Sequence, residues 1–220
     1  MNPSTKPSFS SADHQFMAQA LELAKHGLYT TTPNPRVGCV IVKDDQVIGK
    51  GWHRRAGEAH AEINALTEAG LQASGATVYV TLEPCSHQGR TGPCVQALID
   101  ANVAKVCFAA KDPNPQVSES VKQLQDAGID VASGLFAEES EQLNAGYFKR
   151  VREGRPHVAL KLAMSLDGRT AMASGESQWI TGSDARAQVQ HLRAQSCAIV
   201  TGIGTILQDA VSYTQLTLPT

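Results

Sequence analysis

The 220-residue sequence predicts a layered α/β protein built from two domains. Apolar runs of strand length alternate with helical segments between residues 10 and 152, an order that places helices over the faces of a sheet. A polar connection containing glycine and proline follows at residues 152–157, and the alternation then restarts. We therefore expect a first domain at residues 1–153 and a second at residues 154–220.

The first predicted element is a helix at residues 10–27. Its apolar side chains recur on one face, as in a helix that packs against a core. Ser10 or Ser11 supplies the N-terminal cap, and Gly27 is a residue that commonly ends helices.

A hairpin is predicted next, because two apolar runs in residues 36–53 flank a polar Asp44-Asp45 turn. The later elements of the first domain alternate between helix and strand. They are a helix at 60–70, a strand at 76–83, a helix starting near Pro93, a strand at 105–110, a helix at 119–127, a strand at 128–133 and an amphipathic helix at 137–152.

The second domain is predicted to begin with a strand at residues 157–164. A helix follows at 182–195, capped by Ser183 or Asp184, and then a strand at 197–205 that runs into a glycine-rich turn.

The composition excludes several classes of protein. A net charge of −2 gives no sign of a nucleic-acid-binding surface. No apolar run approaches the roughly 20 residues of a membrane span, and the N-terminus lacks the apolar region of a secretory signal. We expect a cytoplasmic protein whose partners are a small substrate and, at most, further copies of itself.

The five cysteines fall into two groups. Cys39, Cys107 and Cys197 lie within apolar runs and are interpreted as small buried hydrophobic residues. Cys85 and Cys94 lie in the polar loop "PCSHQGRTGPC". In a reducing compartment, such closely spaced cysteines are more often metal ligands or catalytic groups than disulfide partners.

His60 completes a candidate zinc site with Cys85 and Cys94. His60 opens a helix and Cys94 lies in the first turn of another, where the helix dipole favours the thiolate form that metals bind. Three protein ligands leave a fourth position for water, as in catalytic zinc sites. Glu62, two residues after His60, can reach the same space and move a proton there.

Two alternatives remain at this point. The spacing between the cysteines is longer than in the P-C-x-x-C pattern of zinc deaminases. A closed structural zinc site with His87 as the fourth ligand, in a module without catalytic activity, is the first alternative. A deaminase of nucleic-acid bases is the second, although the sequence lacks the basic surface that such an enzyme needs.

Three stretches, "TTPNPRVGCVIVKD", "GWHRRAGEAHAEINAL" and "TLEPCSHQGRTGPCVQALI", closely resemble the bifunctional riboflavin-biosynthesis deaminase/reductases. The resemblance runs from about residue 13 to residue 209, and it implies a cytidine-deaminase-like three-layer α/β/α domain. It also implies zinc on His60, Cys85 and Cys94, with Glu62 as the proton shuttle. The longer cysteine spacing is normal in that family.

The same resemblance implies a substrate and its binding residues. The substrate is 2,5-diamino-6-(5-phospho-D-ribosylamino)pyrimidin-4(3H)-one, which loses its 2-amino group as ammonia. Asn34 would hold the pyrimidine, His53 would line the site, and Arg90 suits the phosphate because arginine binds such oxyanions in a bidentate manner.

The stretch "LKLAMSLDGRTAMASGESQWITGSDARAQVQHLRAQSCAIVTGIGTIL" resembles the start of the reductase domain of that family, a dihydrofolate-reductase-like α/β domain that uses NADPH. The implied site residues belong to cofactor and substrate binding. They are Ala163, Trp179 and Thr205 beside NADPH, and Lys161, Ser177 and Arg193 beside the substrate.

Two departures from the family pattern stand out. The second "PNP", at residues 113–115, lacks the Gly-x-Gly that commonly follows it. Residues 210–220 match nothing in the family, and we expect the reductase domain to be truncated and its activity to be absent.

Overall fold

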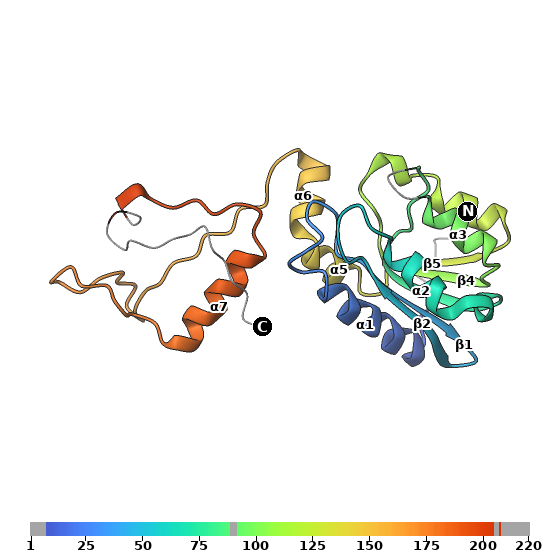
Figure 1. Cartoon of the computed structure of the whole chain (residues 1–220), viewed down its shortest axis with the longest axis horizontal. Helices are drawn as coiled ribbons and strands as arrows, with labels where there is room; N and C mark the ends of the chain where they lie inside the picture. The colour runs from blue at the N-terminus through green and yellow to red at the C-terminus, as the bar shows by residue number, and fades with distance from the viewer. Residues whose placement is uncertain (1–7, 89–91, 205–206, 208–220) are drawn as a thin grey trace. The chain divides into compact units, whose positions relative to one another are not determined.

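The computed structural model describes residues 8–88, 92–204 and 207, and the chain divides into two units between His157 and Val158 (Figure 1). The first unit holds the sheet and nearly all helices. Among the described residues of the second unit, α7 (Ser183–Ala194) is the one helix longer than two residues.

A five-stranded sheet forms the centre of the first unit, in the order β2-β1-β3-β4-β5. β1 pairs antiparallel with β2 and β3, whereas β3, β4 and β5 run parallel. The strands are β1 (Gly38–Lys43), β2 (Gln46–Trp52), β3 (Thr77–Leu82), β4 (Lys105–Ala110) and β5 (Asp130–Ser133), close to the predicted ranges.

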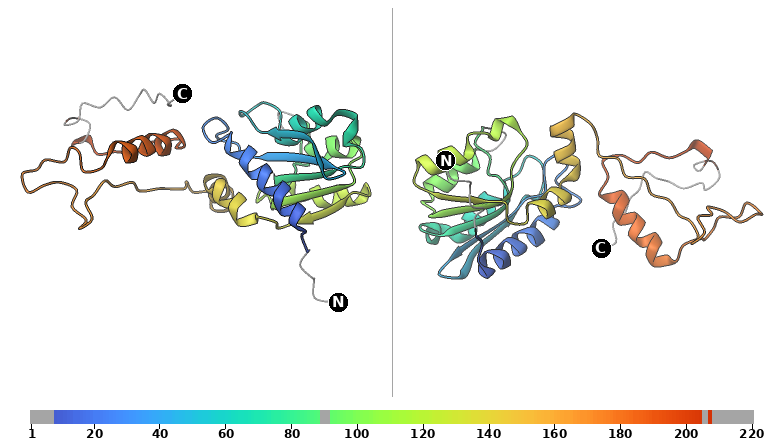
Figure 2. Two further views of the ribbon diagram at one scale, coloured as in Figure 1. Left: turned by 90° about the horizontal axis from the view of Figure 1, so that it is seen from below. Right: turned by 180° about the vertical axis from the view of Figure 1, so that it is seen from behind.

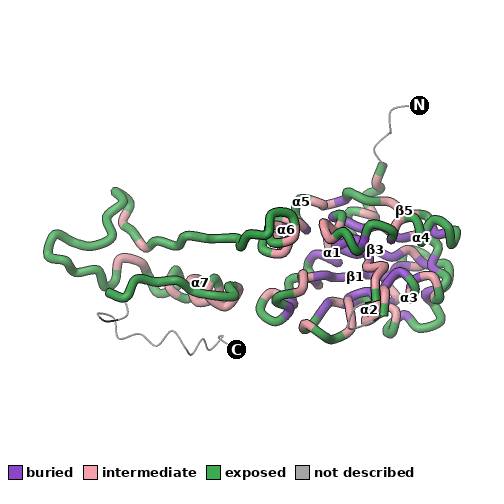
Figure 3. Tube along the Cα trace, turned by 90° about the horizontal axis from the view of Figure 1, so that it is seen from above, coloured by how far each residue is buried: buried purple, intermediate pink, exposed green. Residues whose placement is uncertain are grey.

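Helices cover both faces of this sheet, so the first unit has the predicted three-layer α/β/α architecture (Figures 1 and 2). α1 (Ser11–Lys25) and α5 (Ala137–Leu143) pack on one face. The other face carries α2 (Ala61–Ala69), α3 (Cys94–Asp100) and α4 (Ser120–Asp126), with the short 3-10 turns η1 (Gly70–Ala73) and η2 (Pro115–Val117) between them. Figure 3 shows the buried residues concentrated in this unit.

The start of α1 confirms the predicted cap. Ser10 is the N-cap, its hydroxyl accepts a hydrogen bond from the Asp13 backbone N–H, and the Asp13 carboxylate accepts one from the Ser10 N–H. This reciprocal pair is a capping box. Phe16 and Ala20 lie buried on the inner face of the helix, as its periodicity predicts.

The hairpin turn lies at Asp44 and Asp45, as predicted. Both residues have positive φ angles, 49° and 58°. Turns of this kind match the right-handed twist of the strands that they join, and aspartate tolerates the left-handed region better than most residues.

Two glycines allow helices to lie directly on the sheet. A methyl group at Gly38 would overlap the Ala20 carbonyl oxygen of α1, and one at Gly51 would overlap the Ala61 carbonyl oxygen of α2. Because no side chain separates the backbones, the first turn of α2 is fixed against β2.

The single helix predicted at 137–152 is wrong, because it is interrupted at Asn144. α5 ends there and α6 (Ala145–Glu153) begins. The Asn144 side chain is buried and bonds to the Arg36 backbone on both sides, the Arg36 N–H donating to Oδ1 and Nδ2 donating to the Arg36 carbonyl. These tertiary bonds outweigh the local preference for one continuous helix.

In the second unit, the predicted helix is present as α7 (Ser183–Ala194), but its N-cap is Gly182 rather than Ser183 or Asp184. The predicted strands at 157–164 and 197–205 are wrong for the residues that the structure describes, which form no strand there. No neighbouring strand pairs with them, and their apolar side chains are exposed: Leu160 by 84% and Val200 by 96%.

None of the helices in the described part of the chain combines the length and the hydrophobicity that a membrane crossing requires.

Candidate active site

Three predicted metal ligands meet where two helices begin. His60 is the N-cap of α2, Cys94 is the first residue of α3, and Cys85 lies in the loop that follows β3. The His60 Nδ1 atom lies 3.2 Å from Cys94 Sγ and 3.5 Å from Cys85 Sγ, and one potential ligand atom from each residue falls within 4.8 Å of the others. The sequence prediction that these residues converge is therefore confirmed.

The donor set fits zinc. Zinc bonds of about 2.3 Å to sulfur and 2.0 Å to nitrogen put tetrahedral ligand atoms roughly 3.5 Å apart. The Cys85 thiol accepts hydrogen bonds from the Cys94 thiol and, at 3.4 Å, from the Cys94 backbone N–H, which lower the pKa of Cys85 to about 4. His87 lines the neighbouring cavity but is not part of the ligand cluster.

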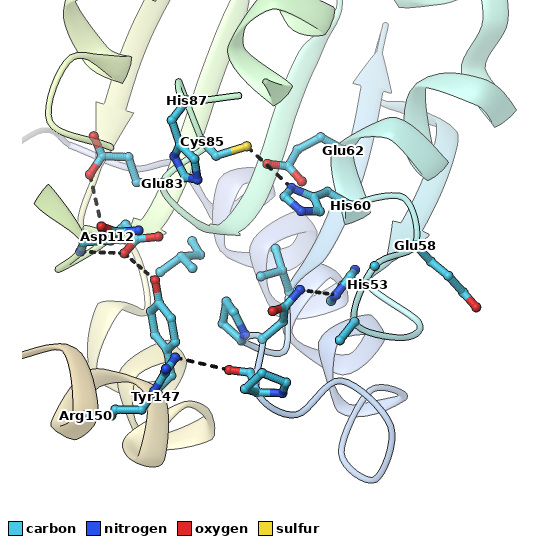
Figure 4. Close-up of a pocket in the computed structure, with 18 residues that line it drawn as sticks. His53, Glu58, His60, Glu62, Glu83, Cys85, His87, Asp112, Tyr147 and Arg150 are labelled. Atoms are coloured by element: carbon cyan, nitrogen blue, oxygen red, sulfur yellow. Dashed lines mark hydrogen bonds between the residues drawn. The ribbon is translucent and has the colours of Figure 1, made fainter. Parts of the chain in front are cut away.

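Glu62 lies beside this cluster in the first turn of α2 (Figure 4). It is only 4% exposed. Burial raises the pKa of its carboxyl group to about 7, and the nearby charge of Cys85 adds to the effect. Within the part of the chain that the structure describes, Glu62 forms no ion pair with a lysine, arginine or histidine. Its burial shows that it is not a solvated helix residue.

A cavity of about 460 Å³ opens in front of these groups. Asn34 and His53, both predicted to bind substrate, line it. Asn34 Nδ2 donates to His53 Nε2 at 3.1 Å, and His53 Nδ1 donates to the Ala59 carbonyl at 3.1 Å, so one neutral tautomer satisfies both contacts. Burial lowers the pKa of His53, which favours that neutral form.

The opposite wall of the cavity contains residues that the sequence analysis did not select. Asp112 Oδ1 accepts hydrogen bonds from the Asn114 N–H and the Tyr147 hydroxyl, both at 2.8 Å. Glu83 accepts from the Asp112 N–H and from the Ser120 hydroxyl. The "DPNP" turn was a visible signal for Asp112, whereas Tyr147 lies in a segment whose sequence indicated only an amphipathic helix.

The departure after the second "PNP" leaves an ordered loop. Asn114 caps the η2 turn by accepting a hydrogen bond from the Gln116 N–H at 3.1 Å. Ser120, at the start of α4, is buried against Glu83. The segment therefore holds its place in the cavity wall without the expected glycines.

The remaining predicted site residues are Arg90 and those of the proposed reductase site. Arg90 and Thr205 lie outside the described residues. Lys161, Ser177 and Trp179 are exposed, and Ala163 and Arg193 are partly buried, so the described residues of the second unit form no enclosed cofactor site.

The cysteines with no predicted chemical role behave differently from one another. Cys39 and Cys107 are buried in the sheet, as predicted. The prediction for Cys197 is wrong, because this residue is exposed in a segment that has no paired strand.

The fold and the His/Cys/Cys cluster define a zinc-deaminase type of domain. Residues 10–110 match the family model described as cytidine and deoxycytidylate deaminase zinc-binding region, and residues 156–219 match the RibD C-terminal domain. The chain belongs to the RibD family of riboflavin biosynthesis proteins.

Similar proteins cover both units. The chain is 60% identical to the riboflavin biosynthesis protein RibD of Escherichia coli over 92% of its own length and 55% of that protein. The RibD of Haemophilus influenzae is 57% identical over 91% of this chain and 54% of that protein. The chain thus spans about half the length of the curated relatives that it matches.

Solved structures agree with this assignment. Acinetobacter baumannii RibD, form 1, aligns with a TM-score of 0.86 and 58% identity, over 91% of this chain and 56% of that one. A Thermotoga maritima diaminohydroxyphosphoribosylaminopyrimidine deaminase/5-amino-6-(5-phosphoribosylamino)uracil reductase aligns with a TM-score of 0.86 and 40% identity, over 90% and 57%.

Proposed function

We propose that the first unit is a zinc-dependent deaminase of riboflavin biosynthesis. Its substrate would be 2,5-diamino-6-(5-phospho-D-ribosylamino)pyrimidin-4(3H)-one and its product the corresponding aminouracil. The observation that carries the proposal is the cluster of His60, Cys85 and Cys94 with the buried carboxyl group of Glu62 beside it, inside a cavity. The similarity to the RibD proteins supports the choice of substrate.

In this proposal, His60, Cys85 and Cys94 would hold the metal, and zinc bound there would supply a water activated for attack at neutral pH. Hydrolysis would join the water oxygen to the ring carbon and break the bond from that carbon to the 2-amino nitrogen. Glu62 would accept a proton from the water and deliver it to the leaving nitrogen, which departs as ammonia. The burial of Glu62 keeps bulk water from competing for that proton.

The cavity wall would orient the pyrimidine. Asn34 is held by His53, and His53 by the Ala59 carbonyl, so the amide group presents fixed polar atoms to the ring. Arg90 stays a proposed phosphate ligand from the sequence resemblance alone.

We also infer that residues 1–153 form the deaminase domain and that residues 154–220 belong to the NADPH-dependent reductase domain of the family. The match of residues 156–219 to the RibD C-terminal domain supports this division. Ala163, Trp179 and Thr205 would contact NADPH, and Lys161, Ser177 and Arg193 the reductase substrate. A cytoplasmic location and a homo-oligomeric state remain predictions.

Incubation of the zinc-loaded protein with the diaminopyrimidine, with ammonia release as the readout, tests the deaminase assignment. One ammonia per substrate is the expected result, with or without NADPH. A protein that holds one zinc and releases no ammonia from this substrate would instead be the non-catalytic zinc module. Activity on cytosine or adenine in an oligonucleotide, and none on the diaminopyrimidine, would mark a base deaminase.

A further inference from the structure

The charges around the deaminase cavity are unevenly distributed. Four described residues that line it carry carboxyl groups: Glu58, Glu62, Glu83 and Asp112. Among the described lining residues, Arg150 alone is a lysine or arginine. Apart from the zinc-type cluster, Arg150 is therefore the described position in the cavity lining where an anionic ligand meets a fixed positive charge.

Arg150 differs from the other basic residues of α6. Lys149 forms an ion pair with Glu153 at 3.0 Å, and Arg152 pairs with Glu141 through two contacts of 2.7 and 2.8 Å. Within the described part of the chain, no carboxylate lies within ion-pairing distance of Arg150. The one basic side chain of this helix that lines the cavity is also the one without an acidic partner.

The Arg150 side chain is nevertheless held in place. Its Nη2 donates to the Pro33 carbonyl at 3.4 Å, and its guanidinium carbon lies 5.8 Å from the centre of the Tyr147 ring. The Tyr147 hydroxyl is in turn fixed by Asp112. These contacts use one of the five N–H donors of the guanidinium group and leave the others available to a ligand.

Figure 4 places Arg150 and Tyr147 across the cavity from His60 and Glu62. A substrate whose reacting edge lies at His60 and Glu62 would extend its opposite end toward α6. In a phosphoribosylated pyrimidine, that opposite end is the phosphate, the only strongly anionic group of the molecule.

We propose that Arg150 binds the phosphomonoester of the deaminase substrate. This inference rests on the proposed function and adds a specificity-determining residue from outside the zinc-binding motifs. Arginine suits the role because its planar fork donates paired hydrogen bonds to phosphate oxygens. Arg150 is exposed at the rim of the cavity, so its contribution is to binding and not to the chemical step.

Steady-state deamination by Arg150→Gln, with Arg152→Gln as the matched control on the same helix, tests the proposal. Arg150→Gln should raise KM for the phosphorylated substrate about tenfold or more, with kcat within about twofold, as expected for a lost charged hydrogen bond. With the dephosphorylated substrate, the variant and the wild type should have the same KM. Arg152→Gln should resemble the wild type with both substrates, and Arg150→Lys should restore part of the lost affinity.

An equal loss with both substrates, or no change in KM with either, would overturn the proposal. It would also be overturned if Arg90→Gln, and not Arg150→Gln, abolished the preference for the phosphorylated substrate.

Calorimetric titration with D-ribose 5-phosphate separates this proposal from the deaminase assignment, because it requires no turnover. The wild type and Arg152→Gln should bind the phosphate ester, and Arg150→Gln should bind it at least about tenfold more weakly. If the protein released no ammonia but still showed this difference, the phosphate site would stand and the reaction would be wrong. If ammonia were released and all three proteins bound equally, Arg150 would not be the phosphate ligand.

Discussion

Arg36 and Asn144, 108 residues apart, hold each other's polar groups: the Arg36 N–H donates to Asn144 Oδ1 at 2.7 Å, and Asn144 Nδ2 donates to the Arg36 carbonyl at 2.9 Å. The pair joins the loop before β1 to the junction of α5 and α6. It thereby ties the cavity wall at Asn34 to the wall at Tyr147.

Asn144→Ala should reduce the free energy of unfolding of the first unit by about 2 to 4 kcal/mol, because the partly buried N–H and carbonyl groups of Arg36 lose their partners. Chemical denaturation followed by far-UV circular dichroism measures the change. Gln142→Ala, at an exposed position two residues earlier, is the control and should change stability by less than about 0.5 kcal/mol. If the two variants were equally stable, the Arg36 contacts would not determine the position of the helix junction.

Glu62→Gln should retain zinc and lose about 10²- to 10⁴-fold in kcat, since the amide keeps the shape of the side chain but cannot carry the proton. Metal analysis and ammonia release are the two measurements. Glu58→Gln is a matched control, because Glu58 lines the same cavity but is exposed. Near-wild-type turnover by a zinc-loaded Glu62→Gln protein would remove Glu62 from the mechanism.

Cys94→Ser should lower the zinc content well below one per chain, whereas Cys197→Ser, at an exposed cysteine outside the cluster, should leave it at one. Chelation of the wild type should lower its Tm, because a ligand that binds only the folded state stabilises that state. Cobalt substitution adds a further check, since an absorption spectrum typical of four protein ligands would mean that the site is closed and His87 has joined it.

Hydrogen exchange should be much faster in residues 158–204 than in the first unit. The described residues of this segment include no buried side chain, and α7 is their one regular helix of more than two residues. Amide groups that lack both burial and ladder hydrogen bonds open at little cost. Mass spectrometry after short labelling measures the difference, and protection in 158–164 comparable to that of β4 would contradict it.

Gly51→Ala should destabilise the first unit by about 1 to 3 kcal/mol or more and weaken zinc binding, because the added methyl group displaces the first turn of α2. Gly146→Ala is the control: in α6, a methyl group at this position would meet only the His157 Cβ atom, at an ordinary contact distance of 4.0 Å, and alanine favours the helix. Denaturation curves and zinc affinity of both variants give the answer. Unchanged zinc affinity in Gly51→Ala would show that α2 can shift without moving His60.

The limits of sequence reasoning follow from the range of the interactions involved. The sequence predicted the Ser10 cap and the Asp44-Asp45 turn, because capping and turn preferences act between neighbouring residues. It also predicted that His60 meets the two cysteines, because metal ligands of these types recur as sequence motifs. The break at Asn144 was not, since it depends on a partner 108 residues away. Arg150 was missed for a related reason. Arg152 has an acidic partner, Glu141, and Arg150 has none among the described residues, but the sequence does not show which acidic residues lie near each of them in space.

The close contact between Gly51 and Ala61 has a consequence for how function is encoded. Ala61 directly follows His60, so the distance of the His60 backbone from the sheet depends on Gly51, a residue of β2 without a side chain. The position of this proposed metal ligand therefore depends partly on a methyl group that is not there. A redesign that copied every polar group of the site into another scaffold, but not this bare position, would reproduce the ligands and misplace them.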